Sequence, residues 1–498
     1  MTDVNKTTDT QDSAVPITNV DPGSSGYAIK TPFRVSLNAS GQIVELVCHK
    51  ALRILPGKRL VCCGKWIDKK IVAKFFLDSN KAAKHCEREE NGLSALRKAG
   101  IKTPDLLFKG TLHQGALPVL IFKKLDPADN LEILWKKAES HSQRIDLLKK
   151  IVRIIAVQHE AGIKQDDIHL ANFMLFKDQI YTLDGSAVDF RNLGRPLPAA
   201  ASLNNLALFL AQFYPEFDEL IKKIFALYVS KRSIFFKQHD CERLIKKVSL
   251  YREYKKKSYL KKIFRECSAF ACKKNHNSLT ICDRQYQSEL MDTFLADPDI
   301  FFKTCTFLKQ GNTSTVALVK INGRQLVVKR YNVKSFLHSF RYLFRKSRAS
   351  VSWKNAQRLF YILNIPTPKP VAFLEKRLGL FKKKSYFITE YIDGISAYNL
   401  FHSNEVEDIA GRKHLVCMFG RLLQSLSDAL LSHGDFKASN FIISNDKVFL
   451  LDLDAMQEHS FRWMFRKKFR RDCLRLTQNL KELPQLAEMF KKALVKKT

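Results

Sequence analysis

The sequence predicts an α+β fold made of two tandem domains, each with a strand-rich N-terminal lobe and a helical C-terminal lobe. Two observations support this prediction. First, the chain has 498 residues and is 45% hydrophobic, which is more than one hydrophobic core usually serves. Second, one order of predicted elements occurs twice: strand-like runs, an acidic turn, an amphipathic helix, a polar loop and a short pair of strands.

The repeat is clearest around two matching segments, KAGIKTPDLL at residues 98–107 and ILNIPTPKPV at residues 362–371. Apolar residues at helical spacing predict an amphipathic helix after each segment, at residues 146–162 and 414–434. In the second half, an Asn-Gly pair at residues 322–323 lies between alternating apolar runs and predicts a β-hairpin.

These elements divide the chain into three parts. Residues 1–30 are polar, lack the apolar core of a signal peptide, and are expected to form a flexible tail. Residues 31–290 are predicted to be the first domain, with the basic, helical stretch 195–290 forming its helical lobe and a connector. Residues 291–498 are predicted to be the second domain.

The charge is strongly one-sided, with 84 Lys and Arg against 49 Asp and Glu, a net +35. Such a surplus favours an anionic partner: nucleic acid, anionic lipid or a phosphorylated substrate. Basic residues alternate with aromatic ones at 340–348 and 461–471, which suits an anionic membrane surface or glycolipid, although a solvated face is the simpler interpretation. No recognisable nucleic-acid-binding motif is present.

The eleven cysteines lack zinc spacing, which fits reduced thiols in a cytosol. No apolar run approaches the length of a membrane span.

Two matched triplets of polar residues predict a phosphotransfer site in each half. Asp435 and Asn440 are 5 residues apart and Asp452 follows 12 residues later; Asp167, Asn172 and Asp184 repeat both spacings after the same kind of helix. In protein-kinase-like folds the D-x-x-x-x-N loop supplies the catalytic base and one metal ligand, and a later aspartate supplies the second metal ligand. One such pair is a weak signal, but two copies in matched contexts are strong.

Each triplet has a lysine upstream within a short apolar run, Lys74 in IVAKFF and Lys329 in LVVKRY. A lysine on a strand usually snorkels to solvent, but with the downstream triplet these two are expected to bind nucleotide phosphates. Of the three acidic residues in the charged helix that follows Lys74, Glu89 is the predicted partner because it shares the apolar stripe of Leu96. The corresponding helix of the second half has no acidic residue, so Lys329 is expected to lack this partner.

A phosphate-covering loop is only weakly marked. In LKQGNTSTV, Gly311, Thr313 and Ser314 could present backbone N–H groups and hydroxyls to a phosphate, or the segment could be an ordinary turn between strands.

The segments VVKRYN, NIPTPKPV, FITEYIDG, HGDFKASNF and LLDLDAM, with AKFFL, EREENGL, AGIKTP and QDDIHLANF in the first half, resemble the lipopolysaccharide core (Kdo/heptose) kinases, which have a protein-kinase-like fold. The resemblance implies that Asp167 and Asp435 are catalytic bases, that Asn172, Asp184, Asn440 and Asp452 hold Mg²⁺, and that Lys74 and Lys329 bind ATP. It also implies a sugar hydroxyl of the lipopolysaccharide inner core as acceptor, on the cytoplasmic face of the inner membrane.

Two departures separate the copies. Lys329 lacks a helical acidic partner, and Gln165 stands where the second copy has His433, so the first catalytic loop is expected to be held differently. Either domain could be a pseudokinase.

The alternatives to a lipopolysaccharide core kinase are a protein kinase, an aminoglycoside-type phosphotransferase, and a pseudokinase scaffold at a membrane. The missing arginine of H-R-D and the missing D-F-G and A-P-E argue against a regulated protein kinase.

Overall fold

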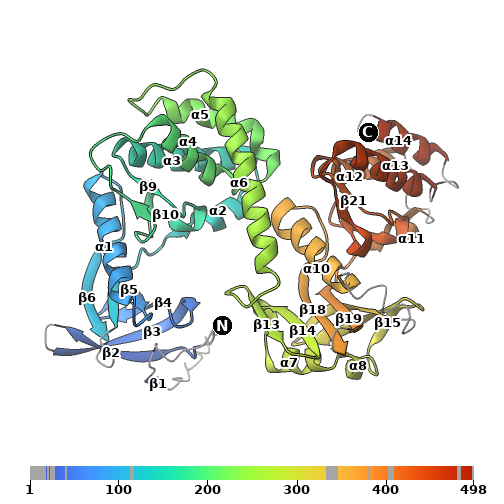
Figure 1. The fold of residues 1–498 in the computed structure, drawn as a ribbon, viewed down its shortest axis with the longest axis horizontal. Helices are drawn as coiled ribbons and strands as arrows, with labels where there is room; N and C mark the ends of the chain where they lie inside the picture. The colour runs from blue at the N-terminus through green and yellow to red at the C-terminus, as the bar shows by residue number, and fades with distance from the viewer. Residues whose placement is uncertain are drawn as a thin grey trace, which may run out of the picture. The chain divides into compact units, whose positions relative to one another are not determined.

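The computed structural model of the chain describes residues 18–19, 22, 29–39, 42–112, 117–332, 346–378, 381–401, 409–478, 480 and 484–495. It divides into two compact units, residues 1–252 and residues 253–498. Each unit has a sheet followed by a helical part, so the predicted α+β class with two repeated regions is confirmed (Figure 1).

The first unit begins with a seven-stranded sheet in the order β1-β2-β3-β4-β5-β7-β6, in which β2 also pairs with β6. Helix α1 packs against β5 and β7 (Figure 1). The strands and the helix are β1 (Thr18–Asn19), β2 (Phe33–Ala39), β3 (Gln42–Leu55), β4 (Arg59–Trp66), β5 (Lys69–Phe76), α1 (Ala82–Lys98), β6 (Leu106–Leu112) and β7 (Pro118–Lys123).

The helical part of the first unit surrounds a core of aliphatic and aromatic side chains. Its elements are β8 (Asp129–Asn130), α2 (Leu131–Lys137), α3 (His141–Glu160), β9 (Lys164–Gln165), β10 (Phe173–Phe176), β11 (Gln179–Thr182), β12 (Val188–Asp189), α4 (Ala199–Leu210), α5 (Ile221–Val229) and α6 (Asp240–Lys262). The polar loop between β9 and β10 follows α3, the helix predicted at 146–162.

The second unit repeats this plan with a sheet in the order β13-β14-β18-β19-β17-β16-β15. The elements of its first part are β13 (Phe270–Lys274), β14 (Ser278–Asp283), α7 (Glu289–Ala296), α8 (Pro298–Phe301), β15 (Thr306–Gln310), β16 (Ser314–Ile321), β17 (Arg324–Tyr331), α10 (Arg348–Gln357), β18 (Pro370–Leu378) and β19 (Phe381–Glu390). The predicted hairpin is confirmed: β16 and β17 pair around Asn322 and Gly323, and both of these residues have positive φ, as a two-residue turn requires.

The helical part of the second unit follows β19. It comprises β20 (Ile395–Ser396), α11 (Ala397–Phe401), α12 (Ile409–Asp428), β21 (Leu431–Ser432), β22 (Phe441–Ser444), β23 (Lys447–Leu450), β24 (Gln457–Glu458), α13 (Arg462–Gln478) and α14 (Pro484–Val495). Helix α12 confirms the helix predicted at 414–434, with earlier bounds. Among the residues described, no helix is long and apolar enough to cross a membrane.

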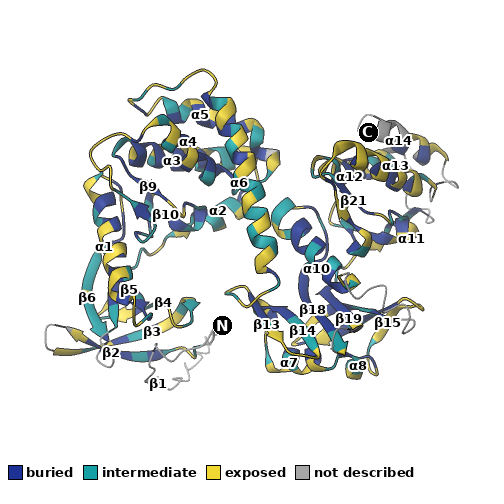
Figure 2. Cartoon of the chain, in the orientation of Figure 1, coloured by how far each residue is buried: buried dark blue, intermediate teal, exposed yellow. Residues whose placement is uncertain are grey.

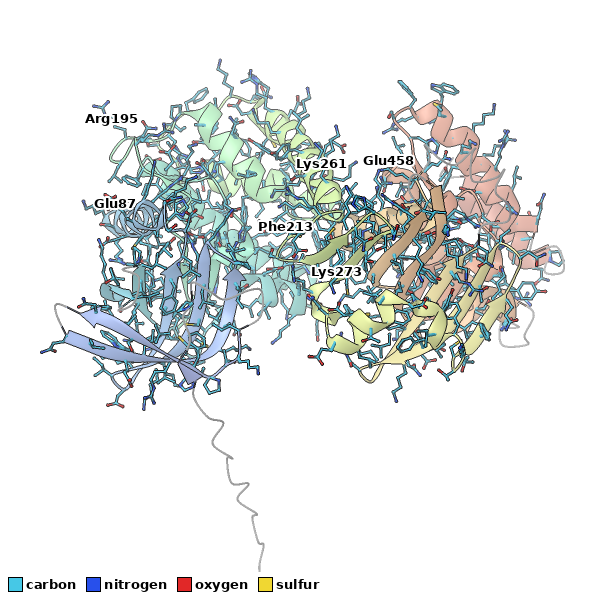
Figure 3. The ribbon with its side chains drawn as sticks, turned by 60° about the horizontal axis from the view of Figure 1, so that its bottom comes forward. Glu87, Arg195, Phe213, Lys261, Lys273 and Glu458 are labelled. Carbon is cyan, nitrogen blue, oxygen red and sulfur yellow. The ribbon has the colours of Figure 1, made fainter. Side chains whose placement is uncertain are left out.

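The boundary between the units was expected at residue 290. It lies at residue 252, inside α6. Strands β13 and β14 complete the second sheet, in which β14 pairs with β18. The end of α6 also belongs to the second unit, where Lys256 donates to Glu458, a residue labelled in Figure 3, and Trp353 donates to the carbonyl of Ile263. Residues 253–290 are therefore part of the second unit and not a connector of the first.

Candidate functional site

In the first unit, the structure places Lys74 on β5 against Glu89 on α1. The ammonium donates to Glu89 Oε1 and, at 2.9 Å, to the carbonyl of Leu183, which directly precedes Asp184. Glu89 is fully buried, and Lys74 is 13% exposed. Burial raises the pKa of Glu89, while the charge of Lys74 opposes this rise. The pair thus links the sheet, α1 and the segment that carries Asp184.

Helix α1 lies directly on the backbone after Asp184. A Cβ atom at Gly92 would be 2.0 Å from the carbonyl oxygen of Gly185, so only glycine permits this approach. The N–H of Gly185 also donates to Glu89 Oε1 at 3.3 Å. A larger residue at Gly92 would therefore displace α1 from Asp184.

The three polar residues of the first triplet lie in one neighbourhood. Asn172 Nδ2 donates to the carbonyl of Asp167 at 2.8 Å, and its own main-chain carbonyl accepts from Leu183 N. Burial acts to raise the pKa of Asp184, but the charge of Lys74 and the bonds from Ser186 outweigh it, so the pKa lies below its ordinary value. Asp184 is therefore an anion in a mostly buried position.

Gln165 holds the first loop differently from its counterpart His433. Its main-chain carbonyl accepts from Asn205 Nδ2 at 2.7 Å. Its side-chain Nε2 is buried and has no hydrogen-bond partner among the residues that the structure describes. Asn205 in turn accepts from His159, which is fully buried.

In the second unit, Lys329 on β17 pairs with Asp452 itself, at 2.5 Å from Nζ to Oδ1. Helix α10 contains no acidic residue, and the carboxylate that Lys329 contacts is that of Asp452. Burial acts to raise the pKa of Asp452, and Lys329 outweighs it and lowers the pKa. The predicted phosphate-binding cation and the predicted metal ligand therefore contact each other directly.

The position of Glu89 is taken by Ser352 in the second copy. Near the helix ends, Ile101 N donates to the carbonyl of Leu96, and Ile365 N donates to that of Leu359 across the π-helical segment Arg358–Leu363 that follows α10. Counting seven residues back from these leucines gives Glu89 and Ser352. Ser352 is fully buried, and its hydroxyl lies 2.8 Å from that of Tyr331.

Helix α10 reaches the second site through a different ion pair. Arg348, at its first turn, pairs with Asp454 at 2.5 Å, two residues after Asp452. Asn355 Nδ2 donates to the carbonyls of Leu453 and Met456 at 2.9 and 3.1 Å. Arg348 and Asn355 thus connect α10 to the segment of Asp452, a connection that α1 makes through Glu89 and Gly92.

The loop of the second unit that follows β21 surrounds Asp435 with polar groups. Asn440 Nδ2 donates to its main-chain carbonyl at 2.7 Å and to Oδ2 at 3.2 Å, Lys437 Nζ is 3.1 Å from Oδ2, and Arg475 of α13 is 3.0 Å from Oδ1. Burial acts to raise the pKa of Asp435, but Lys437 and Arg475 outweigh it, so the pKa lies below its ordinary value. The sequence did not single out Lys437 or Arg475.

His433 and Asp472 hold this loop in place. Asp472 is buried on α13 and accepts from the backbone N–H groups of His433 at 2.6 Å and Gly434 at 3.0 Å. His433 Nε2 lies 2.8 Å from the carbonyl of Leu451, and its Nδ1 accepts from Asp435 N. The imidazole thus connects the segment of Leu451 to the backbone of Asp435. Asp472 was also missed, although it is the one acidic residue on the buried stripe of a basic helix.

A cavity of about 330 Å³ lies between the sheet and the loop of the second unit. Its lining residues include Ser314, Val316, Lys329, Phe387, Glu390, Tyr391, Asn440, Leu451 and Asp452. Of the three predicted phosphate-loop residues, Ser314 lines the cavity, while Gly311 and Thr313 stand in the exposed turn before it, where Gly311 N donates to the carbonyl of Ser314.

The residues of this cavity fit a hard divalent cation. Asn440 uses Nδ2 for both of its bonds to Asp435, so these bonds do not engage its Oδ1, and Asp452 supplies a carboxylate. Amide and carboxylate oxygens are the donors that Mg²⁺ prefers. Asn172 in the first unit also uses Nδ2 internally, so the same pair of oxygens is present there with Asp184.

A comparison with known proteins identifies the family of the chain. The model of the lipopolysaccharide kinase (Kdo/WaaP) family matches residues 66–247 and again residues 306–494. The chain belongs to this family, and the predictions of a kinase and of two tandem copies are confirmed. Members of the family are lipopolysaccharide kinases.

Sequence and structure comparisons add little beyond the family. No curated protein matches the chain significantly. Among solved structures, the chain is similar to "WaaP in complex with acyl carrier protein", at 15% identity over 41% of this chain and 80% of the other, with a TM-score of 0.26.

Proposed function

We propose that the chain is an ATP-dependent phosphotransferase that phosphorylates a sugar hydroxyl of the lipopolysaccharide inner core, and that each unit is a protein-kinase-like domain. The second unit is the proposed transfer site. The observation that carries this choice is the cavity that brings Lys329, Asn440 and Asp452 together beside the loop of Asp435.

The residues of the second unit have separate roles in this proposal. Lys329 binds the ATP phosphates and exchanges its contact with Asp452 for them. Asn440 and Asp452 hold Mg²⁺, which neutralises charge on the phosphates when bound. Asp435 orients the acceptor hydroxyl and takes its proton, and the nearby Lys437 adds positive charge where the phosphoryl group transfers.

The first unit offers the same set of groups. Lys74 with Glu89 binds the nucleotide, Asn172 and Asp184 hold the metal ion, and Asp167 is the base. The main difference from the second loop is the Nε2 of Gln165, which has no hydrogen-bond partner within the described part of the chain. In this proposal the first unit either catalyses a second transfer or positions the substrate.

The acceptor class rests on the family and on charge. A net charge of +35 favours an anionic acceptor such as lipopolysaccharide core or another anionic glycolipid. In this proposal the chain acts in the cytoplasm, at the inner face of the inner membrane. A protein kinase or an aminoglycoside-type phosphotransferase would share Asp435 and Asn440. A pseudokinase scaffold would share the fold but not require either residue.

Mass spectrometry of the lipopolysaccharide core from a strain lacking this chain tests the proposal. Loss of one phosphate group, restored by the wild-type chain but not by a chain with Asp435→Asn, is expected. An unchanged core, with phosphate at every wild-type position, would reject the lipopolysaccharide acceptor.

A further inference from the structure

Helix α13 presents an unusual exposed surface. Its basic side chains are all exposed: Arg462, Arg466, Lys467, Lys468, Arg470, Arg471 and Arg475. The side chains of Trp463, Met464 and Leu474, and of Phe461 just before the helix, are exposed as well, with Trp463 at 67% and Leu474 at 52%. The acidic residue of the helix, Asp472, is buried. Figure 2 shows exposed residues along α13. The surface that they form is cationic and apolar at the same time.

The two kinds of side chain share one face of the helix. Phe465, Phe469, Cys473 and Leu476 are buried in the core of the second unit. At 100° per residue, the opposite side contains Trp463, Met464, Lys467, Arg470, Arg471 and Leu474, which we call the outer face of α13. Trp463 and Leu474 are about 16 Å apart along the axis, with basic residues between them.

The same helix holds the catalytic loop. Asp472 accepts from His433 N and Gly434 N, and Arg475 pairs with Asp435. A surface that touches the outer face therefore lies about one helix diameter, about 10 Å, from the loop of the proposed base.

We propose that the outer face of α13 docks the chain on an anionic lipid surface. Lipid headgroups supply diffuse negative charge for the basic side chains. Tryptophan favours the boundary between headgroups and acyl chains, and Leu474 and Met464 insert beside it. Nucleic acid would use aromatic side chains for stacking but offers no such site for exposed aliphatic ones. An acidic protein satisfies the charges, but the exposed apolar groups would then need a matching pocket.

This inference deepens the proposed function, because a lipid-anchored acceptor would be held at the surface nearest Asp435. It does not depend on the acceptor's identity. Of the other basic, aromatic segment at 340–348, only residues 346–348 are among those described.

Sedimentation of the full chain with vesicles tests the docking, without ATP or lipopolysaccharide, so its outcome is independent of phosphotransfer. Vesicles of phosphatidylglycerol and phosphatidylethanolamine are compared with vesicles of phosphatidylcholine. Lys467→Glu with Arg471→Glu should weaken binding to the anionic vesicles at least about tenfold. The matched control, Lys413→Glu with Lys447→Glu, reverses two exposed basic residues elsewhere in the second unit and should bind like the wild type.

Fluorescence gives a second readout, since Trp463 is one of four tryptophans and Trp353 is fully buried. Anionic vesicles should shift the emission to the blue, and Trp463→Phe should remove most of the shift. Equal binding by the Lys467/Arg471 and Lys413/Lys447 variants would overturn the proposal. So would binding to poly-glutamate or RNA without binding to anionic vesicles. Circular dichroism of each variant verifies that it is folded.

Discussion

Removing the carboxylate of Glu89 should destabilise the first unit far more than the equivalent change destabilises the second. In Glu89→Ala, the Lys74 ammonium stays almost buried with the carbonyl of Leu183 as its remaining hydrogen-bond partner. Breaking a buried pair by removing one partner costs about 3–5 kcal/mol. Because Lys74 is 13% exposed and keeps that carbonyl, we expect the lower end, about 3 kcal/mol.

Two further variants separate the causes. Ser352→Ala, at the matching position of α10, removes a bond to the buried Tyr331 hydroxyl and should cost about 1–2 kcal/mol in the second unit. The double change Lys74→Met with Glu89→Leu replaces the pair by apolar side chains. It should recover most of the stability lost in Glu89→Ala, since apolar replacements of buried pairs are often neutral.

Urea unfolding followed by hydrogen exchange of peptides resolves the two units. Peptides from β5 and α1 report on the first unit, and peptides from β17 and α10 on the second. Two results would contradict this prediction. One is a fall of less than about 1 kcal/mol in the free energy of unfolding of the first unit in Glu89→Ala; the other is an apolar double variant as unstable as Glu89→Ala.

Three other predictions follow from the same contacts. Asp472→Asn keeps one of the two oxygens that accept backbone N–H groups and puts an NH2 donor in place of the other, so it should lower kcat about 10²-fold with little change in the KM for ATP, as steady-state kinetics would measure. Arg348→Asp leaves the buried Asp454 beside a like charge, so the urea midpoint of the second unit should fall. The added change Asp454→Arg should restore part of this loss. Burial lowers the pKa of His159 to about 3, below its value of about 6.5 in the unfolded chain. Unfolding then takes up a proton, so stability should fall as pH drops from about 6.5 toward 3, and His159→Gln should flatten this dependence in urea titrations at each pH.

The sequence predicted the recurring elements because they are local. The Asn322–Gly323 turn and the helices α3 and α12 follow from spacing within a few residues. The first-unit partner Glu89 was also accessible, because a buried acid on an apolar helical stripe requires a cation.

Long-range pairings were not predictable in the same way. The partner of Lys329 lies 123 residues later and had already been assigned to the metal ion. Residues 195–290 were expected to be helical, but residues 270–283 form the hairpin of β13 and β14. This hairpin joins the second sheet through β18, which lies far along the chain, so local pattern did not reveal it. The roles of Asp472 and Arg475 depend on how α13 packs beside the loop, which the helical pattern alone does not give.

The most direct test of the central claim is phosphate transfer from Mg·ATP to isolated lipopolysaccharide core by full-length chains. The wild type, Asp435→Asn and Asp167→Asn are compared under identical conditions. If the second unit is the transfer site, Asp435→Asn should lower the rate at least about 10²-fold, while Asp167→Asn should retain transfer at the position that depends on the second unit. Transfer by Asp435→Asn at the wild-type rate would contradict the account.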